Sequence, residues 1–301
     1  MSNFDINRFG RTLRWVVSVN FRKMLLWFTG SVLAVFLGEV LSQMMYRYDT
    51  PLDMTDDVSL FLRMILIIVS LIMVSSIVSN INEKRKREAF LMLPSSNLEK
   101  YLSLVIYSTV ICIACAFLAI VLGDALRMLA YWASGYQGQL LADGTYKTCV
   151  IDDETGEAFY WWSSSIPMMI EGMFTITNYS KVPVDFIIVE MAFVVGSILW
   201  THSIYTLGGT LLRKYSFVAT SVFVILCLAL LVKLIVLSGG TMFSTQWDHG
   251  KLVRYEIGTM SWICAIAFPI LSALNYWASY RIFKGFELIT NKWFNYDFYK
   301  R

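Results

Sequence analysis

Six ionisable side chains lie inside long apolar stretches of this sequence, where a charge has strong consequences. A charged group left alone in the middle of a membrane costs about 2.5–3.5 kcal/mol, so such groups pair with one another or line a polar pathway. The set contains equal numbers of acids and bases, which allows a single polar layer of mutually satisfied ions. The six are Glu39, Arg63, Asp124, Arg127, Glu190 and Lys233.

Two interpretations of this polar layer stay open. It can line a vestibule that faces outward, through which a polar or amphiphilic substrate leaves. Alternatively, Arg63 and Lys233 extend to the outer headgroups, while Asp124 pairs with Arg127 one helical turn away. In this second case Glu39 and Glu190 are buried partners of Arg63 or Lys233, because short carboxylate side chains cannot reach the headgroups as far as long basic ones.

Motifs of a catalytic centre are missing from the sequence. The two histidines, His202 and His249, fall on opposite sides of the membrane in the topology inferred below. A histidine-based metal site or catalytic pair is therefore not expected. The sequence also has no phosphate-binding loop of the G-x-x-x-x-G-K-[ST] type. We expect no enzyme activity and no cofactor or metal, and the chain cannot be its own ATPase.

The elements that carry these residues are membrane helices. The 301 residues are 57% hydrophobic and 16% charged, whereas soluble domains are about 45–50% apolar and roughly 25% charged. The apolar residues form long runs instead of alternating, which favours helices over a membrane β-barrel. Each run approaches the ~20 residues that cross a bilayer. The expected six spans are residues 24–45, 60–79, 101–123, 184–207, 216–237 and 257–279.

The distribution of Lys and Arg orients the six spans. Seventeen of the 25 basic residues fall on the side that holds both termini, and five fall on the other side. Cytoplasmic loops carry an excess of Lys and Arg, so both termini are expected in the cytoplasm. With this orientation the six ionisable residues all lie in the outer third of their spans.

The remaining segments complete an all-α integral membrane protein. An amphipathic helix is expected near the N-terminus, with Ile6, Phe9 and Leu13 on one face and Arg8 and Arg11 on the other, lying in the inner interface as a lipid anchor. The outer segment is expected to hold a small β-hairpin around the turn at 152–156 and a short helix at 166–174.

The expected organisation is 1–23, cytoplasmic amphipathic helix; 24–133, spans one to three with a cytoplasmic loop at 80–100; 134–183, outer loop domain; 184–279, spans four to six; and 280–301, cytoplasmic tail.

The loop between the second and third spans is the most informative stretch. Pro94 ends the preceding helix, because proline disfavours the helical conformation of Leu93. Ser96 and Glu99 form a capping box, so the helix of the third span begins directly after a tight turn. This predicts a short helix over residues 81–92, basic at its start and apolar at its end. An exposed apolar tip beside charge usually marks a protein contact. The alternative is that the basic run only orients the protein while the apolar end folds back into the membrane surface.

This loop, together with the six-span layout, resembles a type 2 ABC permease, the membrane subunit of an exporter whose ATPase is a separate polypeptide. The layout covers nearly the whole chain. The residue-level match covers about 20 residues, the charged run at 83–88 and the segment FLMLPSSNLEK at 90–100. They are similar to the charged run and the leucine-leucine-proline-small segment of such permeases, especially those of Bacteroidetes-like bacteria. Many members elaborate the region between the last two spans, where this chain has only residues 238–256.

The resemblance implies that the loop is a coupling helix that docks on the ATPase. Its implied contact residues are Arg85, Arg87, Glu88, Phe90, Leu93 and Pro94. It also implies a multi-pass location in a bacterial inner membrane, membrane lipid around the spans, and a second permease subunit in a homo- or heterodimer; no nucleic-acid partner is expected. Two alternatives remain, a non-transporting scaffold or sensor whose outer loop binds a partner, and a membrane-embedded enzyme. The enzyme is disfavoured because balanced ion pairs do not form a nucleophile and base.

The topology predicts which positions a membrane-impermeant thiol reagent can reach. Single cysteines at Thr155 and Thr245, introduced into a cysteine-free background, should react with reagent added outside intact cells. A cysteine at Ser95 should react only after permeabilisation, because positions beside the basic loops are cytoplasmic. Labelling of Ser95 in intact cells would contradict the six-span topology.

Overall fold

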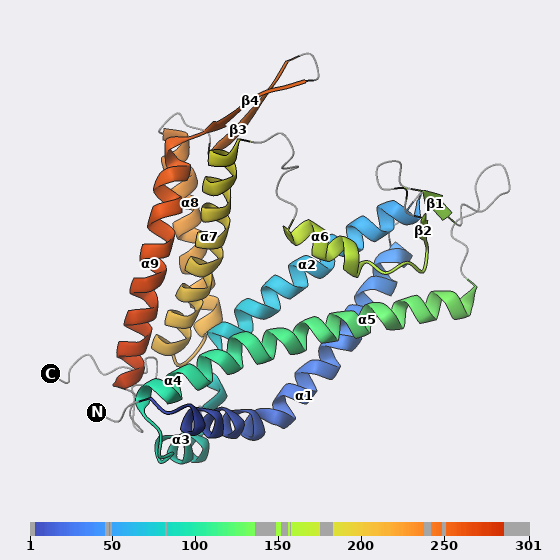
Figure 1. Ribbon diagram of the computed structural model, residues 1–301. Coiled ribbons are helices and arrows are strands. Elements are labelled where there is room, and N and C mark those ends of the chain that lie inside the picture. Colours follow the sequence, from blue (N-terminus) through green and yellow to red (C-terminus); the bar gives the residue numbers. More distant parts are fainter. Residues whose placement is uncertain are drawn as a thin grey trace. The chain divides into compact units, whose positions relative to one another are not determined.

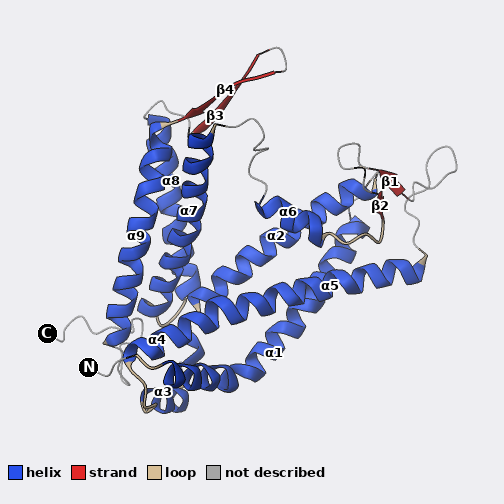
Figure 2. Ribbon diagram, viewed as in Figure 1, coloured by secondary structure: helices blue, strands red, loops and turns tan. Residues whose placement is uncertain are grey.

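The computed structural model describes residues 4–45, 48, 50–81, 83–135, 149–151, 156, 158–174, 183–237, 242–248 and 251–285. This part of the chain is mostly helical, and its strands form two short hairpins (Figure 2). Six segments are long and apolar enough to cross a membrane, as the sequence predicts: Ile6–Gln43, Pro51–Ser75, Asn97–Ser134, Val184–Leu211, Ser216–Leu237 and Thr259–Lys284. The chain is therefore a multi-pass membrane protein.

The elements follow in the order shown by Figure 1. The helices are α1 (Ile6–Met45), α2 (Pro51–Ser75), α3 (Lys84–Leu91), α4 (Asn97–Ile106), α5 (Cys112–Ser134), α6 (Ile166–Phe174), α7 (Val184–Leu211), α8 (Ser216–Leu237) and α9 (Thr259–Lys284). A 3-10 turn (Ser79–Ile81) precedes α3, and a π-helical turn (Tyr107–Ile111) joins α4 to α5. The strands are β1 (Cys149–Ile151), β2 (Ala158–Tyr160), β3 (Phe243–Asp248) and β4 (Lys251–Ile257).

Two of these helices differ from the expected spans. The N-terminal residues do not form a separate helix, because α1 is one helix of 40 residues that begins at Ile6. The third span continues through Gly123 to Ser134 and ends at Gly135, whose φ of 62° glycine adopts without strain. Both helices are therefore longer than the hydrocarbon core requires.

The chain divides into two compact units. The first unit comprises Met1–Val19, Leu71–Thr109 and Thr177–Arg301, and the second comprises Asn20–Ser70 and Val110–Ile176. The first unit therefore contains α3, α4, α7, α8 and α9 with the start of α1, and the second contains α5 and α6 with most of α1 and α2.

In the first unit, α7 lies beside both α8 and α9 (Figure 1). Trp200 of α7 stacks on Phe268 of α9 with ring centroids 5.3 Å apart. Polar side chains also cross between these two helices: the amide of Asn275 donates to the Ser203 hydroxyl at 3.0 Å. Inside a membrane, such small polar residues bind helices together where the hydrophobic effect does not. These contacts make α7 and α9 the central pair of the unit.

In the second unit, the apolar core is made by α1, α2, α5 and α6 with Trp161 from the segment after β2. Met169 of α6 and Trp161 are almost fully buried in this core. The glycine at 123 permits a close approach of α5 to α1, since a Cβ there would lie 2.6 Å from Cγ1 of Val35. The short helix and the residues beyond β2 thus belong to the packed core of the second unit.

Each hairpin consists of two antiparallel strands. In the segment between the third and fourth spans, β1 pairs with β2, and Val150 faces Phe159. The pair of β3 and β4 lies between the last two spans, where the sequence analysis expected only a short connection. Phe243 at the start of β3 packs against Phe186 of α7 at 5.4 Å. This contact attaches the hairpin of β3 and β4 to the start of α7.

The glycine at 209 lies where the backbone of the first unit is closely packed, which yields a stability test. A Cβ at this position would collide with the Ser75 carbonyl oxygen and lie 2.9 Å from Cγ2 of Ile77. A backbone carbonyl cannot move aside cheaply, so Gly209→Ala should lower the melting temperature of the purified protein. Gly10→Ala is the matched control, because nothing lies within 4 Å of a Cβ there and alanine favours a helix by about 0.8–1.0 kcal/mol over glycine. Equal melting temperatures for the two variants would contradict this packing.

Candidate functional site

The loop that carries α3 is built by local sequence signals. The helix begins after Glu83, which has an extended backbone, and ends at Leu91; the N–H of the next residue, Met92, donates to the carbonyl of Glu88 at 3.0 Å. The predicted capping box is present at the start of α4. The Ser96 hydroxyl accepts from the N–H of Glu99 at 3.3 Å, and the Glu99 carboxylate accepts from the N–H of Ser96 at 2.8 Å. These bonds fix the tight turn between α3 and α4.

The Glu99 side chain does more than cap its own helix. It is completely buried, and its Oε1 accepts from the backbone N–H of Asp5 at 2.9 Å and from Nη2 of Arg8 at 3.1 Å. One carboxylate thus ties the start of α1, the turn after α3 and the start of α4 together. The sequence spacing reveals the capping box, but it contains no signal for the bonds to residues more than 90 positions earlier.

The Phe90 side chain is fully buried, so the expectation that it forms an exposed apolar tip is wrong. Its ring lies 5.8 Å from the ring of Trp15 and 6.4 Å from that of Phe283. Tyr101 packs on Phe283 and on Tyr280, each with ring centroids 5.5 Å apart. We call these five residues the aromatic cluster. It buries apolar area from α1, α3, α4 and α9. The cluster thereby fixes the side of α3 that carries Phe90.

A second expected contact residue, Arg87, is also buried, with 2% of its surface exposed. Burial lowers the pKa of its guanidinium, and the positive charge of Arg213, in the connection between α7 and α8, lowers it further. Arg87 therefore faces the interior of the unit and is not available as an external contact. Lys100 adds a further bond behind α3, because its ammonium group donates to the carbonyl of Leu91 at 2.8 Å.

The opposite side of α3 is exposed. Arg85, Ala89 and Met92 are spaced four and three residues apart, which places them on one helical face. Met92 is 83% exposed, a high value for an apolar side chain. Of the other expected contact residues, Pro94 is exposed, and Glu88 and Leu93 are half-buried. We call Arg85, Ala89 and Met92 the outer face of α3.

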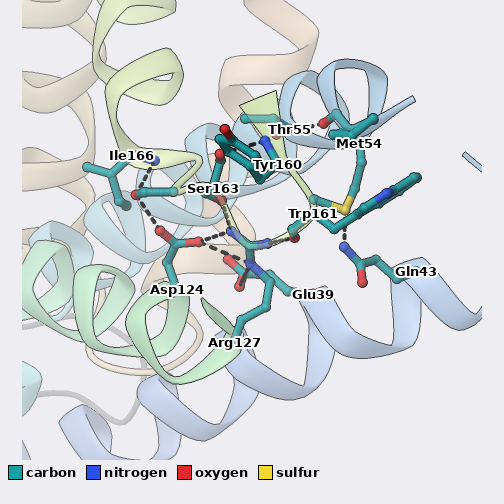
Figure 3. A network of polar contacts seen from close by, with 12 residues as sticks. Glu39, Gln43, Met54, Thr55, Asp124, Arg127, Tyr160, Trp161, Ser163 and Ile166 are labelled. Atoms are coloured by element: carbon teal, nitrogen blue, oxygen red, sulfur yellow. Dashed lines mark hydrogen bonds and ion pairs between the residues drawn. The ribbon is translucent and has the colours of Figure 1, made fainter. Parts of the chain in front are cut away.

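In the second unit, three of the six ionisable residues form one buried network (Figure 3). Arg127 of α5 lies between two acids, with Nε 3.1 Å from Oε2 of Glu39 and Nη2 2.6 Å from Oδ1 of Asp124. At most 1% of each side chain is exposed. The pair of Asp124 and Arg127 is the one predicted from their spacing. The partner of Glu39 was expected to be Arg63 or Lys233, and the structure shows that it is Arg127.

Groups from the segment after β2 complete this network (Figure 3). Nη2 of Arg127 donates to the carbonyl of Ser163 at 2.7 Å, and Nη1 to that of Trp161 at 3.5 Å. The hydroxyl of Ser164 donates to Oδ2 of Asp124 at 2.6 Å. Buried charges are tolerated when they are paired and hydrogen-bonded. Arg127 and Asp124 meet both conditions, whereas the Glu39 carboxylate is paired with Arg127 but has no hydrogen bond among the described residues. The network therefore joins α1, α5 and the residues that lead into α6. It contains the expected pair of Asp124 and Arg127, while the partner of Glu39 differs from the expected one.

The described contacts of the other three ionisable residues are different. Arg63 of α2 donates to the carbonyl of Ser59 at 3.3 Å and to its hydroxyl at 3.2 Å, and Gly172 of α6 lies against its guanidinium. Glu190 and Lys233 belong to the first unit, where Glu190 is half-buried and Lys233 is exposed. The described contacts thus assemble three of the six expected members.

The imidazole of His202 in the first unit lies between two hydroxyl groups, an arrangement that was not expected from the sequence. Its Nδ1 lies 2.6 Å from the hydroxyl of Tyr276, and its Nε2 lies 2.9 Å from the hydroxyl of Thr109 in the π-helical turn. Both ring nitrogens are therefore engaged by hydroxyl groups. Throughout the part of the chain that the structure describes, no three His, Cys, Asp or Glu side chains are grouped so that they could hold a metal ion.

No protein family, curated protein or solved structure matches this chain.

The buried network predicts a strongly non-additive set of stabilities. Arg127→Gln leaves Glu39 and Asp124 as two buried carboxylates without their cation, which should cost about 3–5 kcal/mol of folding free energy. Neutralising all three, with Glu39→Gln and Asp124→Asn added, should recover most of this loss, because neutral amides can hydrogen-bond to one another. Melting temperatures in detergent measure the effect.

Arg63→Gln is the matched control for this series. It removes an arginine that bonds only to Ser59 among its described partners, and we expect a loss of about 1 kcal/mol or less. Equal losses for Arg63→Gln and Arg127→Gln would show that the three ions do not act as a unit.

Proposed function

We propose that this chain is the six-span permease subunit of an ABC exporter, and that a separate ATP-binding subunit drives it by docking on the outer face of α3. The observation that carries the proposal is the anchoring of α3. Its inner side is fixed by the aromatic cluster and by the bond from Lys100, while its outer face is exposed. A helix held this way transmits a displacement to the elements behind it.

The force would reach the membrane helices through buried contacts. Phe90 is the central ring of the aromatic cluster, so a movement of α3 pushes on α1 through Trp15 and on α9 through Phe283. Glu99 adds a polar link from the α3 turn to the start of α1. Packed interfaces respond to such a push by switching between discrete arrangements. Closure of two ATP-bound motor subunits would thereby favour an outward-open over an inward-open permease dimer.

The chemistry of the outer face fits a protein partner. Arg85 supplies a positive charge, Met92 supplies an adaptable apolar side chain, and Ala89 between them allows a partner to approach the helix closely. Such a face is complementary to an apolar groove with an acidic rim. The expectation that the chain lacks ATP chemistry of its own agrees with a motor on another polypeptide.

The proposal also gives the chain an orientation. The excess of basic residues on the side of both termini supports an orientation with the termini and α3 in the cytoplasm. The bacterial inner membrane is what the resemblance to ABC permeases implies. At 40 residues α1 is about 60 Å long, twice the ~30 Å hydrocarbon core. Its first part, which carries Arg8, Arg11 and Arg14, would therefore lie as an amphipathic segment in the inner interface. The hairpin of β1 and β2 and helix α6 would face outward.

Co-purification tests the docking proposal. The affinity-tagged chain, expressed in its native host, should retain an ATP-hydrolysing subunit. Arg85→Glu combined with Met92→Asp should reduce the retained ATPase activity at least about tenfold, as the loss of central interface contacts does. The yield and melting temperature of the permease should stay unchanged, because both side chains are on the outer face.

Two further variants make the result specific. Lys284→Glu reverses an exposed charge at the end of α9 and should retain the ATPase. Phe90→Ala removes the centre of the aromatic cluster, so it should lower both the melting temperature and ATPase retention. Unchanged ATPase recovery with the Arg85 and Met92 variant would rule out docking on the outer face of α3.

A further inference from the structure

A pocket of about 430 Å³ lies in the first unit, between the start of α1 and the turn that follows α3. Its polar side comes from α1 and its apolar side mainly from the turn. The lining residues are Arg8, Arg11, Thr12, Trp15, Leu93, Pro94 and Ser95. The coupling proposal uses the outer face of α3 and does not account for this pocket.

The two arginines of the pocket differ in their surroundings. Arg8 is held in position by Glu99, at 3.1 Å, and by Asp5, whose Oδ2 lies 3.9 Å from its Nε. The backbone N–H of Asn7 lowers the pKa of Asp5, so this carboxylate is ionised near neutral pH. Arg11 is exposed, its Nε donates to the carbonyl of Asn7 at 3.3 Å, and it forms no ion pair with any described residue. Arg11 therefore supplies the positive charge available to a ligand.

Ser95 supplies a second recognition element in the wall of the pocket. Its hydroxyl oxygen is buried and has no hydrogen-bond partner among the described residues. A buried polar group without a partner costs about 1–3 kcal/mol. An acceptor oxygen that enters the pocket would remove this cost, and an anionic oxygen would also pair with Arg11. The polar side thus fits an anion with several acceptor oxygens, for which a phosphate group is well suited.

The apolar side selects what the phosphate is attached to. Trp15, Leu93 and Pro94 give the pocket an apolar surface. A free phosphate ion would leave this surface in contact with water. Tryptophan is enriched where membrane proteins meet the headgroup region, and α1 continues from Trp15 into a segment apolar enough to span the membrane. An amphiphile with a phosphate head and an apolar body matches both sides of the pocket.

We infer that this pocket binds the headgroup phosphate of an anionic phospholipid, with Arg11 and Ser95 contacting the phosphate oxygens and Trp15 contacting the start of the acyl region. A lipid bound there bridges α1 and the turn between α3 and α4. It thereby reinforces the connection that Glu99 makes within the protein.

Native mass spectrometry of the full-length protein tests the inference. The protein is titrated in detergent with phosphatidylglycerol and, in parallel, with phosphatidylcholine. We expect one phosphatidylglycerol to bind more tightly than the others, with about tenfold weaker binding to Arg11→Gln and about threefold to tenfold weaker binding to Ser95→Ala. The matched control is Arg14→Gln, which removes an exposed charge from the same helix outside the pocket lining and should bind the lipid as the unchanged protein does.

The Ser95 variant carries the most weight, because it alters no charge. An equal loss of phosphatidylglycerol in Arg11→Gln and Arg14→Gln, with no loss in Ser95→Ala, would indicate diffuse attraction and overturn the site. Equal affinity for phosphatidylcholine would overturn the anionic headgroup. Displacement of the tight lipid by millimolar inorganic phosphate, with Ser95→Ala abolishing the effect, would replace the lipid with a free phosphate ion. Melting temperatures of all variants confirm that each is folded.

Discussion

The arrangement of the α3 loop depends on the hydrogen bonds and the ion pair made by the buried carboxylate of Glu99. Its two oxygens accept from the backbone of Ser96, from the backbone of Asp5 and from the guanidinium of Arg8. A buried carboxylate keeps its charge only when donors surround it in this way. Because those donors come from α1 and from the turn before α4, satisfying the charge forces both into fixed positions. The aromatic cluster then packs on a frame that the carboxylate defines.

The molecule uses buried charge differently in its two units. Around Glu99, backbone donors and one arginine position a loop whose far side is exposed. Around Arg127, two acids and two carbonyl groups enclose a single guanidinium inside the second unit. The first arrangement suits a loop that keeps its position while a partner contacts its exposed side. The second suits a rigid connection between two helices. Neither of these two arrangements presents a nucleophile next to a base.

The features predicted correctly from sequence are those with short-range causes. The six spans follow from long apolar runs, and the capping box of Ser96 and Glu99 from residues three positions apart. The partner of Glu39 is 88 residues away, and Phe90 is covered by Phe283 at the far end of the chain, so no local pattern reveals either. The hairpin of β3 and β4, by contrast, has a local signal: two stretches with strand-forming residues stand on either side of a short polar segment.

Site-specific photo-crosslinking from position 89 tests the coupling role of α3 most directly. A photoreactive phenylalanine analogue would replace Ala89 on the outer face, or Ala133, exposed near the end of α5, as the control. After irradiation of native membranes, position 89 should form one dominant adduct whose peptides contain a G-x-x-x-x-G-K-[ST] sequence, the mark of an ATP-binding subunit. Position 133 should not form it. Adducts from position 89 that lack any ATP-binding protein, or the same adduct from both positions, would contradict the account.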